Sequence, residues 1–377
     1  MKGHQRIKIG EGKISGYLAI FLAILSFGAV ICAYYPEFFT TEDFRALYTP
    51  QFVKWTLLAV LTVSFGFAIT SVILSKTTKY GFIATVLLAI TILLATGLPE
   101  TQAIESKTFS LGLDWLLLDI LISTIIFIPI ELFLPKREDQ SKFHPEWRTD
   151  LIYFVISHLL IQVTGVLVQL PAALAFKNIG LEGFQSAIQS IHFIPQLFLA
   201  LLVSDLFQYT GHYIFHKVPY LWRFHSVHHS TQHLDWLAGS RTHFVDLIAV
   251  RAISFIPIYV CGFSYSVFAT YIVIVSFQAV LAHSNTRINF GWFKYIFVTP
   301  QFHHWHHSDN PDAYDKNFAI HFPFIDMLFG TYYPMGKEWP ESTGLGDVVF
   351  PKGFLKQFAH PFKNPNKNKA PENPSER

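Results

Sequence analysis

Eight apolar runs, each close to the length of a membrane-spanning helix, limit what this chain of 377 residues can fold into. A helix needs about 20 apolar residues to cross a hydrocarbon core of roughly 30 Å. The runs predict an all-α fold, a polytopic helical bundle in a membrane. Because Asp246 and Arg251 lie at or within the seventh run, the last two runs fit either two full spans or a tilted or re-entrant hairpin. The runs occupy residues 16–35, 56–75, 81–98, 113–134, 151–172, 191–210, 245–260 and 265–282.

The composition agrees with a membrane protein and excludes several other classes. Only 14% of the residues are charged, whereas soluble domains carry roughly 25%. Such an apolar chain is not intrinsically disordered. Cys32 and Cys261 are the only cysteines, which excludes a disulfide scaffold. The formal net charge of +2 is too small to indicate a nucleic-acid partner, so none is expected.

The distribution of basic residues predicts how the spans are oriented. Ten lysines and arginines lie before the first run and in the loops after the second and fourth runs, and four lie in the alternate loops. Cytoplasmic loops carry the excess of basic residues. We therefore expect an integral membrane protein whose two termini and polar histidine-bearing segments lie on the cytoplasmic side.

Histidine content divides the chain. Thirteen of the 18 histidines lie between His212 and His321, and the first 112 residues contain almost none. We expect residues 1–112 to form an accessory N-terminal transmembrane bundle and residues 113–360 to form the working domain. Residues 361–377, which are rich in proline, asparagine and lysine, are expected to be a disordered tail.

Three histidine clusters have spacings that put their side chains on one face of a helix. Residues three or four apart are neighbours on a helix surface. Pro219 precedes the second cluster, and Thr299 and Pro300 precede the third as an N-cap and a first-turn proline. The clusters are His212 and His216; His225, His228 and His229; and His303, His306 and His307.

These clusters predict a metal site at the cytoplasmic ends of the spans. Imidazole is the commonest metal ligand in proteins and suits iron, zinc, copper and nickel. Eight imidazoles are too many for one ion. Tetrahedral zinc takes four ligands, often including thiolate, and no cysteine lies near the clusters. Two ions with four to five ligands each would use the whole set.

The stretch from Val203 to Tyr333, which includes these clusters, resembles the fatty acid hydroxylase / sterol desaturase superfamily of membrane histidine-box di-iron oxygenases. The resemblance covers about a third of the chain, and residues 1–112 show no matching motif. The ordered histidine boxes carry most of its specificity. The matching segments are SDLFQYTGHYIFH, LWRFHSVHHS, SRTHF, AHSNTR, TPQFHHWHHS and DMLFGTYY.

The resemblance implies a set of metal ligands, which includes His283 of AHSNTR as an additional ligand. His243 and His304 are implied as possible extra ligands or neighbours of the site. Asp205 shares a helix stripe with His212, so it is the first candidate to hydrogen-bond a ligand histidine, with Asp235, Asp246 and Asp315 as further candidates. The implied ligands are His212, His216, His225, His228, His229, His283, His303, His306 and His307.

The resemblance also implies the activity, that of an O2-dependent oxidoreductase of lipid biosynthesis. Its members hydroxylate or desaturate an unactivated C–H bond of a lipid, with two iron ions as cofactor and O2 as co-substrate. The sequence contains no glycine-rich dinucleotide motif and no thiolate cluster, so the electrons are expected from an external electron-transfer protein. The lipid, the choice between hydroxylation and desaturation, and any catalytic residue besides the ligands stay open.

Three other hypotheses remain. The membrane acyl desaturases of the other histidine-box family usually have a longer first box and a last box that begins with glutamine, unlike HxxxH and HxxHH here. An intramembrane zinc protease needs His-Glu-x-x-His, and the sequence contains no His-Glu pair. A non-enzymatic membrane metal-binding or transport protein would place its ligands near the middle of the membrane, whereas these lie at the ends of the spans.

Overall fold

The structure, a computed structural model, describes residues 11–41, 45, 49–75, 78–98, 110–176 and 179–363. These residues form helices, and the one β-type pairing among them is an isolated bridge between Ser308 and Thr343. The predicted all-α class is confirmed.

Seven helices in the described residues are long and apolar enough to cross a membrane, and each overlaps a predicted run. The last two, α12 and α13, are separate helices joined at Gly262, whose φ of 72° is a backbone conformation that favours glycine. The seven segments are Lys13–Tyr34 (α1), Gln51–Leu74 of α4 (Pro50–Leu74), Lys79–Thr96 (α5), Leu113–Phe133 (α6), Phe193–Lys217 (α10), Phe244–Cys261 (α12) and Tyr265–His283 (α13).

The predicted run 151–172 differs from the others because it is broken. It contains most of α7 (Trp147–Leu159) and most of α8 (Ile161–Phe176), and Trp147–Leu159 meets Val163–Phe176 at 44°. If this bent pair is a single span, the structure has up to eight spans.

Backbone positions divide the chain into two compact units. The first comprises Met1–Ile122 and His158–Val163 and contains α1, α2 (Pro36–Phe39), α4 and α5. Its core is built on fully buried small residues, Ala19, Ala23, Ala68 and Ala84, which let helix backbones approach closely. Ser64 donates a hydrogen bond of 2.8 Å to the Ala19 carbonyl across this interface.

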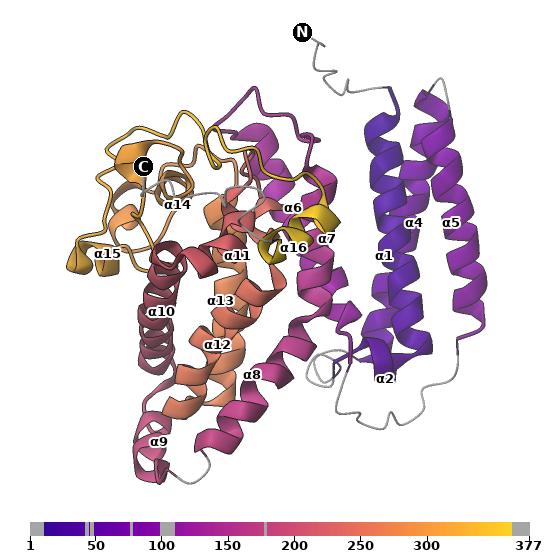
Figure 1. Ribbon diagram of the computed structural model, residues 1–377. Coiled ribbons are helices and arrows are strands. Elements are labelled where there is room, and N and C mark those ends of the chain that lie inside the picture. The colour runs from indigo at the N-terminus through magenta and orange to yellow at the C-terminus, as the bar shows by residue number, and fades with distance from the viewer. Residues whose placement is uncertain are drawn as a thin grey trace. The chain divides into compact units, whose positions relative to one another are not determined.

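The second unit comprises Ser123–Ser157 and Thr164–Arg377 and is built around α10, α12 and α13 (Figure 1). A buried polar cluster links α10 to α13: Ser204 Oγ lies 2.5 Å from Tyr271 Oη, and Gln208 donates to both. Arg251 of α12 donates to the Thr164 hydroxyl and the Ser157 carbonyl, so its charged group is hydrogen-bonded.

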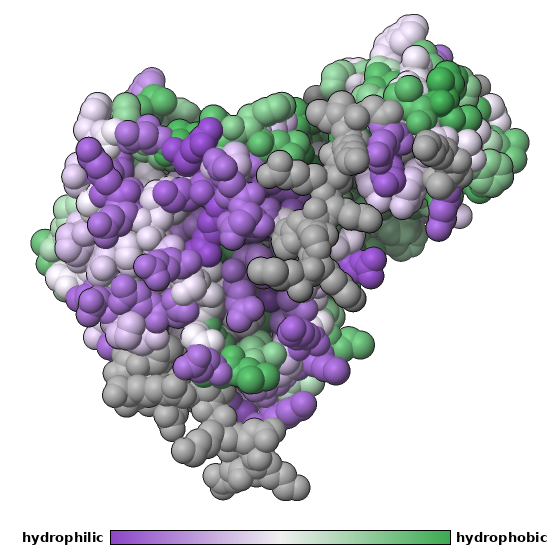
Figure 2. All heavy atoms as spheres, turned by 90° about the horizontal axis from the view of Figure 1, so that it is seen from above, coloured by the Kyte–Doolittle hydropathy of each residue, from purple (hydrophilic) through white to green (hydrophobic). Residues whose placement is uncertain are grey.

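The short elements of the second unit include α11 and α14, which lie at the end of the unit where α10 and α13 finish (Figure 1). Hydrophilic side chains gather over this end, which Figure 2 views from above. The short elements are α9 (Glu182–Gln189), α11 (Pro219–His229), η1 (Ala238–Ser240), η2 (Gly291–Tyr295), α14 (Pro300–His306), η3 (Pro311–Ala313), α15 (Phe324–Phe329), α16 (Phe354–Ala359) and η4 (His360–Phe362).

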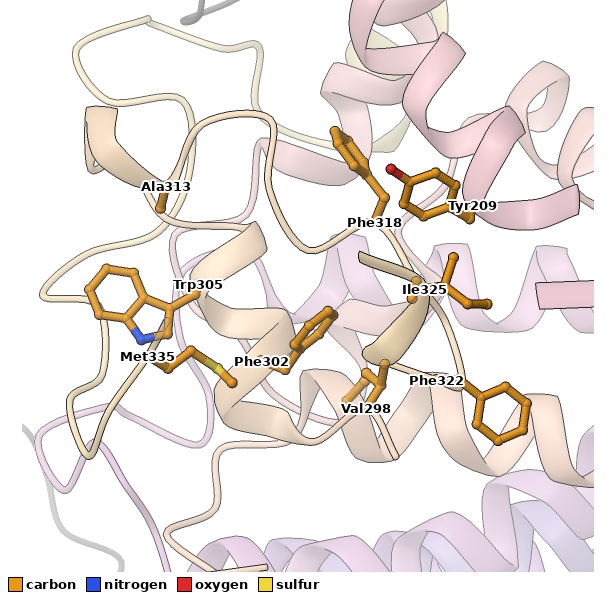
Figure 3. Close-up of a cluster of buried hydrophobic side chains, with 11 residues drawn as sticks. Tyr209, Val298, Phe302, Trp305, Ala313, Phe318, Phe322, Ile325 and Met335 are labelled. Atoms are coloured by element: carbon orange, nitrogen blue, oxygen red, sulfur yellow. The ribbon is translucent and has the colours of Figure 1, made fainter. Parts of the chain in front are cut away.

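A cluster of buried aromatic side chains holds α14 and α15 against α10 (Figure 3). Phe302 and Phe318 are fully buried, and the Tyr209 ring of α10 stacks on Phe329 with centroids 5.0 Å apart. This cluster fixes the position of α14 and its histidines relative to α10.

The start of the predicted tail packs on the second unit. Phe362 contacts the ring of Phe224 with centroids 5.6 Å apart, and Pro361 is buried. From residue 364 on, the predicted disordered tail lies outside the described residues.

Candidate metal centre

The histidines converge because four helices bring them to one place. α10 carries His212 and His216 in its last two turns, and α13 ends on His283. The short helices α11 and α14 each begin with proline. The Thr299 side chain accepts a hydrogen bond from the Phe302 amide, so the predicted N-cap of α14 is confirmed.

The structure brings all nine histidines of the expected ligand set into two groups. Within each group, one ring nitrogen of every histidine lies within 4.8 Å of the others. His229 and His307, one from each group, stack with ring centroids 4.4 Å apart, so the groups adjoin. His212 is half-buried and the other eight are buried. The larger group contains His212, His216, His225, His229 and His306, and the smaller contains His228, His283, His303 and His307.

Ring nitrogens face one another inside each group. In the larger group, Nε2 of His212 lies 3.1 Å from Nε2 of His225. In the smaller group, Nε2 of His283 lies 3.0 Å from that of His303 and 3.3 Å from that of His228. Two nitrogens bound to one ion at about 2.1 Å, at a right angle, are about 3 Å apart. The spacing fits imidazoles that share a metal ion.

The opposite ring nitrogen of four histidines donates a hydrogen bond to a backbone carbonyl. A carbonyl can only accept, so Nδ1 carries the proton and the Nε2 lone pair points into the group. Each bond also fixes the orientation of its ring. The pairs are His212 with Phe318 at 2.8 Å, His228 with Arg241 at 3.1 Å, His283 with Ala279 at 2.7 Å, and His306 with Lys316 at 2.8 Å.

Two carboxylates serve two further histidines in the same way. Asp246, in the first turn of α12, accepts from His225 Nδ1 at 2.8 Å. Asp315 lies 3.3 Å from His216 Nδ1 and also binds Lys217 at 2.6 Å. A carboxylate behind an imidazole raises its basicity as a ligand.

The donor set fits a metal ion because it is electrostatically incomplete without a cation. Lone pairs of facing Nε2 atoms repel one another in a site closed to water. The buried Nε2 atoms of His229 and His306 have no hydrogen-bond partner among the described residues. Buried polar atoms are normally paired, and a cation at the centre of each group would pair all of them.

The environment keeps the histidines outside the spans neutral, as metal ligands must be. Burial, with a contribution from neighbouring histidines, lowers the pKa of His306 to about 3. Burial and adjacent imidazoles also hold the pKa values of His228, His229 and His307 well below the usual range.

Asp205 has a different role from the one expected. Its carboxylate accepts hydrogen bonds from the backbone amides of Ile320, His321 and Phe322, and it makes no hydrogen bond to any of the nine grouped histidines, all of which the structure describes. The shared helix stripe was a correct observation, but the His212 ring turns to the Phe318 carbonyl instead.

His243 and His304 lie outside both groups. His243 caps α12 by accepting from the Val245 amide, and it donates to the Phe358 carbonyl at 3.1 Å. His304 points away from the α14 face that carries the ligand set and lies 3.2 Å from the His283 carbonyl, to which it donates. It therefore supports the backbone of His283 rather than joining the group.

A buried ion pair that the sequence motifs did not indicate supports His228. Arg241 Nε lies 2.5 Å from Asp150 Oδ1, and both side chains are buried. The Arg241 carbonyl is the acceptor for His228 Nδ1. The ion pair thus anchors the loop after η1 in the position that orients this ring.

The loop after η3 supplies three of the other acceptors, the Asp315 carboxylate and two carbonyls, and has unusual backbone geometry. Asp315 and Asn317 have φ values of 54° and 61°, which lie in the left-handed region that residues other than glycine seldom adopt. The Asn317 side chain donates to the Phe302 carbonyl and accepts from the Tyr333 amide, which holds this geometry in place. The carbonyls of Lys316 and Phe318 are thereby aimed at His306 and His212.

Replacing Asp246 tests the role of the carboxylate behind His225. Asp246→Ala removes the acceptor and frees the ring to rotate, so metal affinity should fall by about 10- to 100-fold. Asp246→Asn keeps an oxygen acceptor, so its metal affinity should lie between that of the unchanged protein and that of Asp246→Ala. Metal retained after dialysis against a chelator measures the effect. Asp347→Ala, at an exposed position, is the control, and equal retention in both alanine variants would contradict the assignment.

Gly239 offers a steric test of the smaller group. A Cβ at this position would lie 3.0 Å from His283 Nδ1 and 3.1 Å from the Ala279 carbonyl, so Gly239→Ala should displace the His283 ring. Metal content should then fall, whereas Gly183→Ala, with nothing within 4 Å, should leave it unchanged. Identical metal content in the two variants would show that His283 is not a required ligand.

The metal-free protein should lose stability in acid. The ordinary histidine pKa is 6.5 and the pKa of His306 in the folded protein is about 3. Between these pH values the unfolded chain binds a proton at His306 and the folded protein does not, so acid favours unfolding. This contribution to stability is present above pH 6.5 and is lost as the pH falls towards 3. The thermal unfolding temperature in detergent should therefore decrease from pH 7 to pH 5, and it should do so less in His306→Ala. An equal decrease in both proteins would contradict a buried neutral His306.

Comparisons with known proteins agree with this site. The family model described as fatty acid hydroxylase matches residues 197–331, which include all nine grouped histidines. No solved structure matches the chain significantly.

Three curated relatives illustrate the match. Alkylglycerol monooxygenase of Caenorhabditis elegans is 26% identical over 149 residues, which are 38% of this chain and 28% of that protein. Cholesterol 25-hydroxylase of Mus musculus is 27% identical over 156 residues, 39% of this chain and 50% of that protein. Ornithine lipid hydroxylase of Rhizobium tropici is 30% identical over 251 residues, which cover 64% of this chain and 74% of that protein. The chain therefore belongs to the fatty acid hydroxylase family.

Proposed function

We propose that this chain is a membrane lipid hydroxylase that holds two iron ions in the two histidine groups. The observation that carries the proposal is the convergence of nine imidazoles into two adjoining groups at one end of the second unit's spans. Dinuclear iron with O2 supplies the power to oxidise an unactivated C–H bond, which no amino-acid side chain can provide.

The composition of the donor set supports iron over zinc. Both groups consist of imidazole nitrogens, five in one and four in the other. Structural zinc sites favour four tetrahedral ligands that often include thiolate, whereas imidazole-rich sites with more ligands suit redox-active metals such as iron. The names of the three relatives include hydroxylase and monooxygenase, which agrees with an oxidative metal centre.

The protein's own residues prepare the site in three ways. The carbonyls and carboxylates behind the rings fix which nitrogen faces the metal. The Phe318 ring of the buried aromatic cluster (Figure 3) packs against the larger group, with centroid distances of 5.4 Å to His212, 5.0 Å to His216 and 5.7 Å to His306. The buried Arg241–Asp150 pair keeps the loop behind His228 rigid. Preorganised ligands and a dry cavity are what a protein contributes to metal-based chemistry.

A lipid substrate follows from the position of the site. The groups lie where α10 and α13 end, so an acyl chain or ring system could approach from the bilayer without leaving it. The names of the relatives specify an ornithine lipid, an alkylglycerol and cholesterol, which are all lipids. Hydroxylation is the first reaction to test because two of these three names state it, and desaturation of the same C–H position is the second.

The orientation and the electron source complete the proposal. The excess of basic residues in alternate loops supports a cytoplasmic location for the metal centre and both termini. The sequence has no motif for a nicotinamide, flavin or iron–sulfur group, so a separate electron-transfer protein would deliver electrons to the hydrophilic end of the second unit (Figure 2).

Two single substitutions, one in each group, test the function. His228→Ala and His306→Ala should each abolish formation of oxidised lipid in cells that express the chain, because each removes a ligand from a different group. Both variants should still insert into membranes. The control is His192→Ala, at the exposed N-cap of α10, which should keep full activity.

Metal analysis of the purified protein separates the proposal from metal transport. About two irons per chain and O2-dependent lipid oxidation are expected from a di-iron enzyme. A single exchangeable zinc, or unchanged lipid oxidation in His228→Ala, would overturn the proposal.

A further inference from the structure

The segment after the third histidine cluster forms a hairpin that leaves the metal centre and returns to it. It starts at Asn317, whose amide donates to the Thr331 carbonyl, and it ends at Tyr333, whose amide donates to the Asn317 side chain. Its tip is α15, Phe324–Phe329. Because Phe318 near its start accepts a hydrogen bond from His212, the hairpin adjoins the larger histidine group.

The first part of the hairpin, residues 318–322, lies alongside two membrane-spanning helices, α10 and α13. Its residues 320–322 donate to Asp205 of α10, and the His321 ring lies 6.1 Å from the ring of Tyr271 in α13. Tyr271 is six residues from one end of α13 and twelve from the other, about 9 Å and 18 Å along the helix. Any bilayer that α13 crosses therefore surrounds this level of the protein.

The amides in the first part of the hairpin are satisfied without water. Five consecutive amides, those of residues 318–322, donate to only two carboxylates. Asp326 accepts from Phe318 and Ala319 at 2.8 Å each, and Asp205 accepts from the next three. Irregular backbone at membrane depth is tolerated only where protein groups replace water as hydrogen-bond partners.

α15 exposes apolar side chains and buries its acidic one, the opposite of a surface helix in water. Phe324, Met327, Leu328 and Phe329 are exposed, whereas the single acidic residue, Asp326, is fully buried. Leu328 alone is 76% exposed. An exposed side chain of α10 adjoins this apolar surface: Phe198 is 52% exposed, and its ring centroid lies 5.5 Å from that of Phe322 in the hairpin. An exposed face without a polar side chain matches the surface that a spanning helix presents to lipid.

A neighbouring segment, η2, adds aromatic side chains of the kind found at a membrane surface. Trp292 and Phe293 stack with centroids 4.1 Å apart, and Trp292 is 63% exposed. Phe297, just after η2, contacts Phe322 of the hairpin with centroids 6.0 Å apart. Tryptophan and other aromatic residues concentrate at the boundary between hydrocarbon and water.

We propose that residues 317–333 form a re-entrant hairpin whose tip, α15, inserts into the lipid leaflet at the metal-centre end and contacts acyl chains. The hairpin is then a lipid-facing wall of the metal centre, because the Phe318 carbonyl near its start holds the His212 ring, and the Lys316 carbonyl just before it holds the His306 ring. Its partner is the hydrocarbon of the bilayer, not another protein.

Spin-label accessibility tests the insertion directly and needs neither bound metal nor activity. Leu328→Cys is made in full-length protein in which Cys32 and Cys261 are replaced by alanine, labelled with a nitroxide and reconstituted into phosphatidylcholine vesicles. Phe207→Cys, on α10 and 50% exposed, is the lipid-facing reference. Val349→Cys, 95% exposed and outside the spans, is the water-facing reference.

The expected result is that the label at Leu328 collides readily with O2 and poorly with a water-soluble nickel chelate, as at Phe207. Accessibility to the nickel chelate equal to that at Val349 would place α15 in water and overturn the proposal. Protection from both reagents would show that protein covers α15, and it would overturn the proposal too. If Leu328→Cys does not fold, Met327→Cys on the same exposed face serves instead.

Discussion

Repulsion between facing imidazole lone pairs is the constraint on which the rest of the second unit depends. Nε2 atoms 3.0–3.3 Å apart in a buried site are stable only around a positive charge. Each ring must therefore hold its proton on the opposite nitrogen, and the chain supplies an acceptor there for six of the nine histidines. Those acceptors come from the loop after η1, from α12, from α13 and from the loop after η3, so the hydrogen bonds of the histidines connect segments that are distant in sequence.

The bilayer imposes a second constraint, which concerns the polar groups of the spanning helices. Backbone groups within it need protein partners, and charged side chains within it need hydrogen bonds. Asp205, Asp246 and Arg251 all lie within spanning helices, and each is bonded to backbone or side-chain groups of another element. Asp205 and Asp246 therefore connect spanning helices to the short segments around the histidines, and Arg251 connects α12 to α7 and α8.

Most of the fold and of the ligand set could be predicted from the sequence, because the length of an apolar run and the helical spacing of histidines are local properties. The runs predicted the spanning helices, and the i, i+3, i+4 spacings picked out eight of the nine histidines that the structure groups, whereas His283 was implied by the resemblance. Partners of those histidines were less predictable. Asp246 and Asp315 were candidates among several acids, but the carbonyls of Phe318, Lys316 and Arg241 have no sequence signature, since every residue has one. Asp205 was assigned from its helix stripe, yet the loop that it caps is more than 100 residues away along the chain.

Two pairs of consecutive histidines are divided between the groups. His228 belongs to the smaller group and His229 to the larger, and His307 and His306 are divided in the same way. Adjacent residues share a peptide plane, so a ligand that is fixed in one group also restricts the backbone of its neighbour in the other. Binding of a first ion would thus already order part of the backbone of the second site, so a second ion would lose less conformational entropy on binding. In the proposed di-iron enzyme, metal loading should therefore be cooperative, so that at limiting iron, chains with two ions or none should outnumber singly loaded chains.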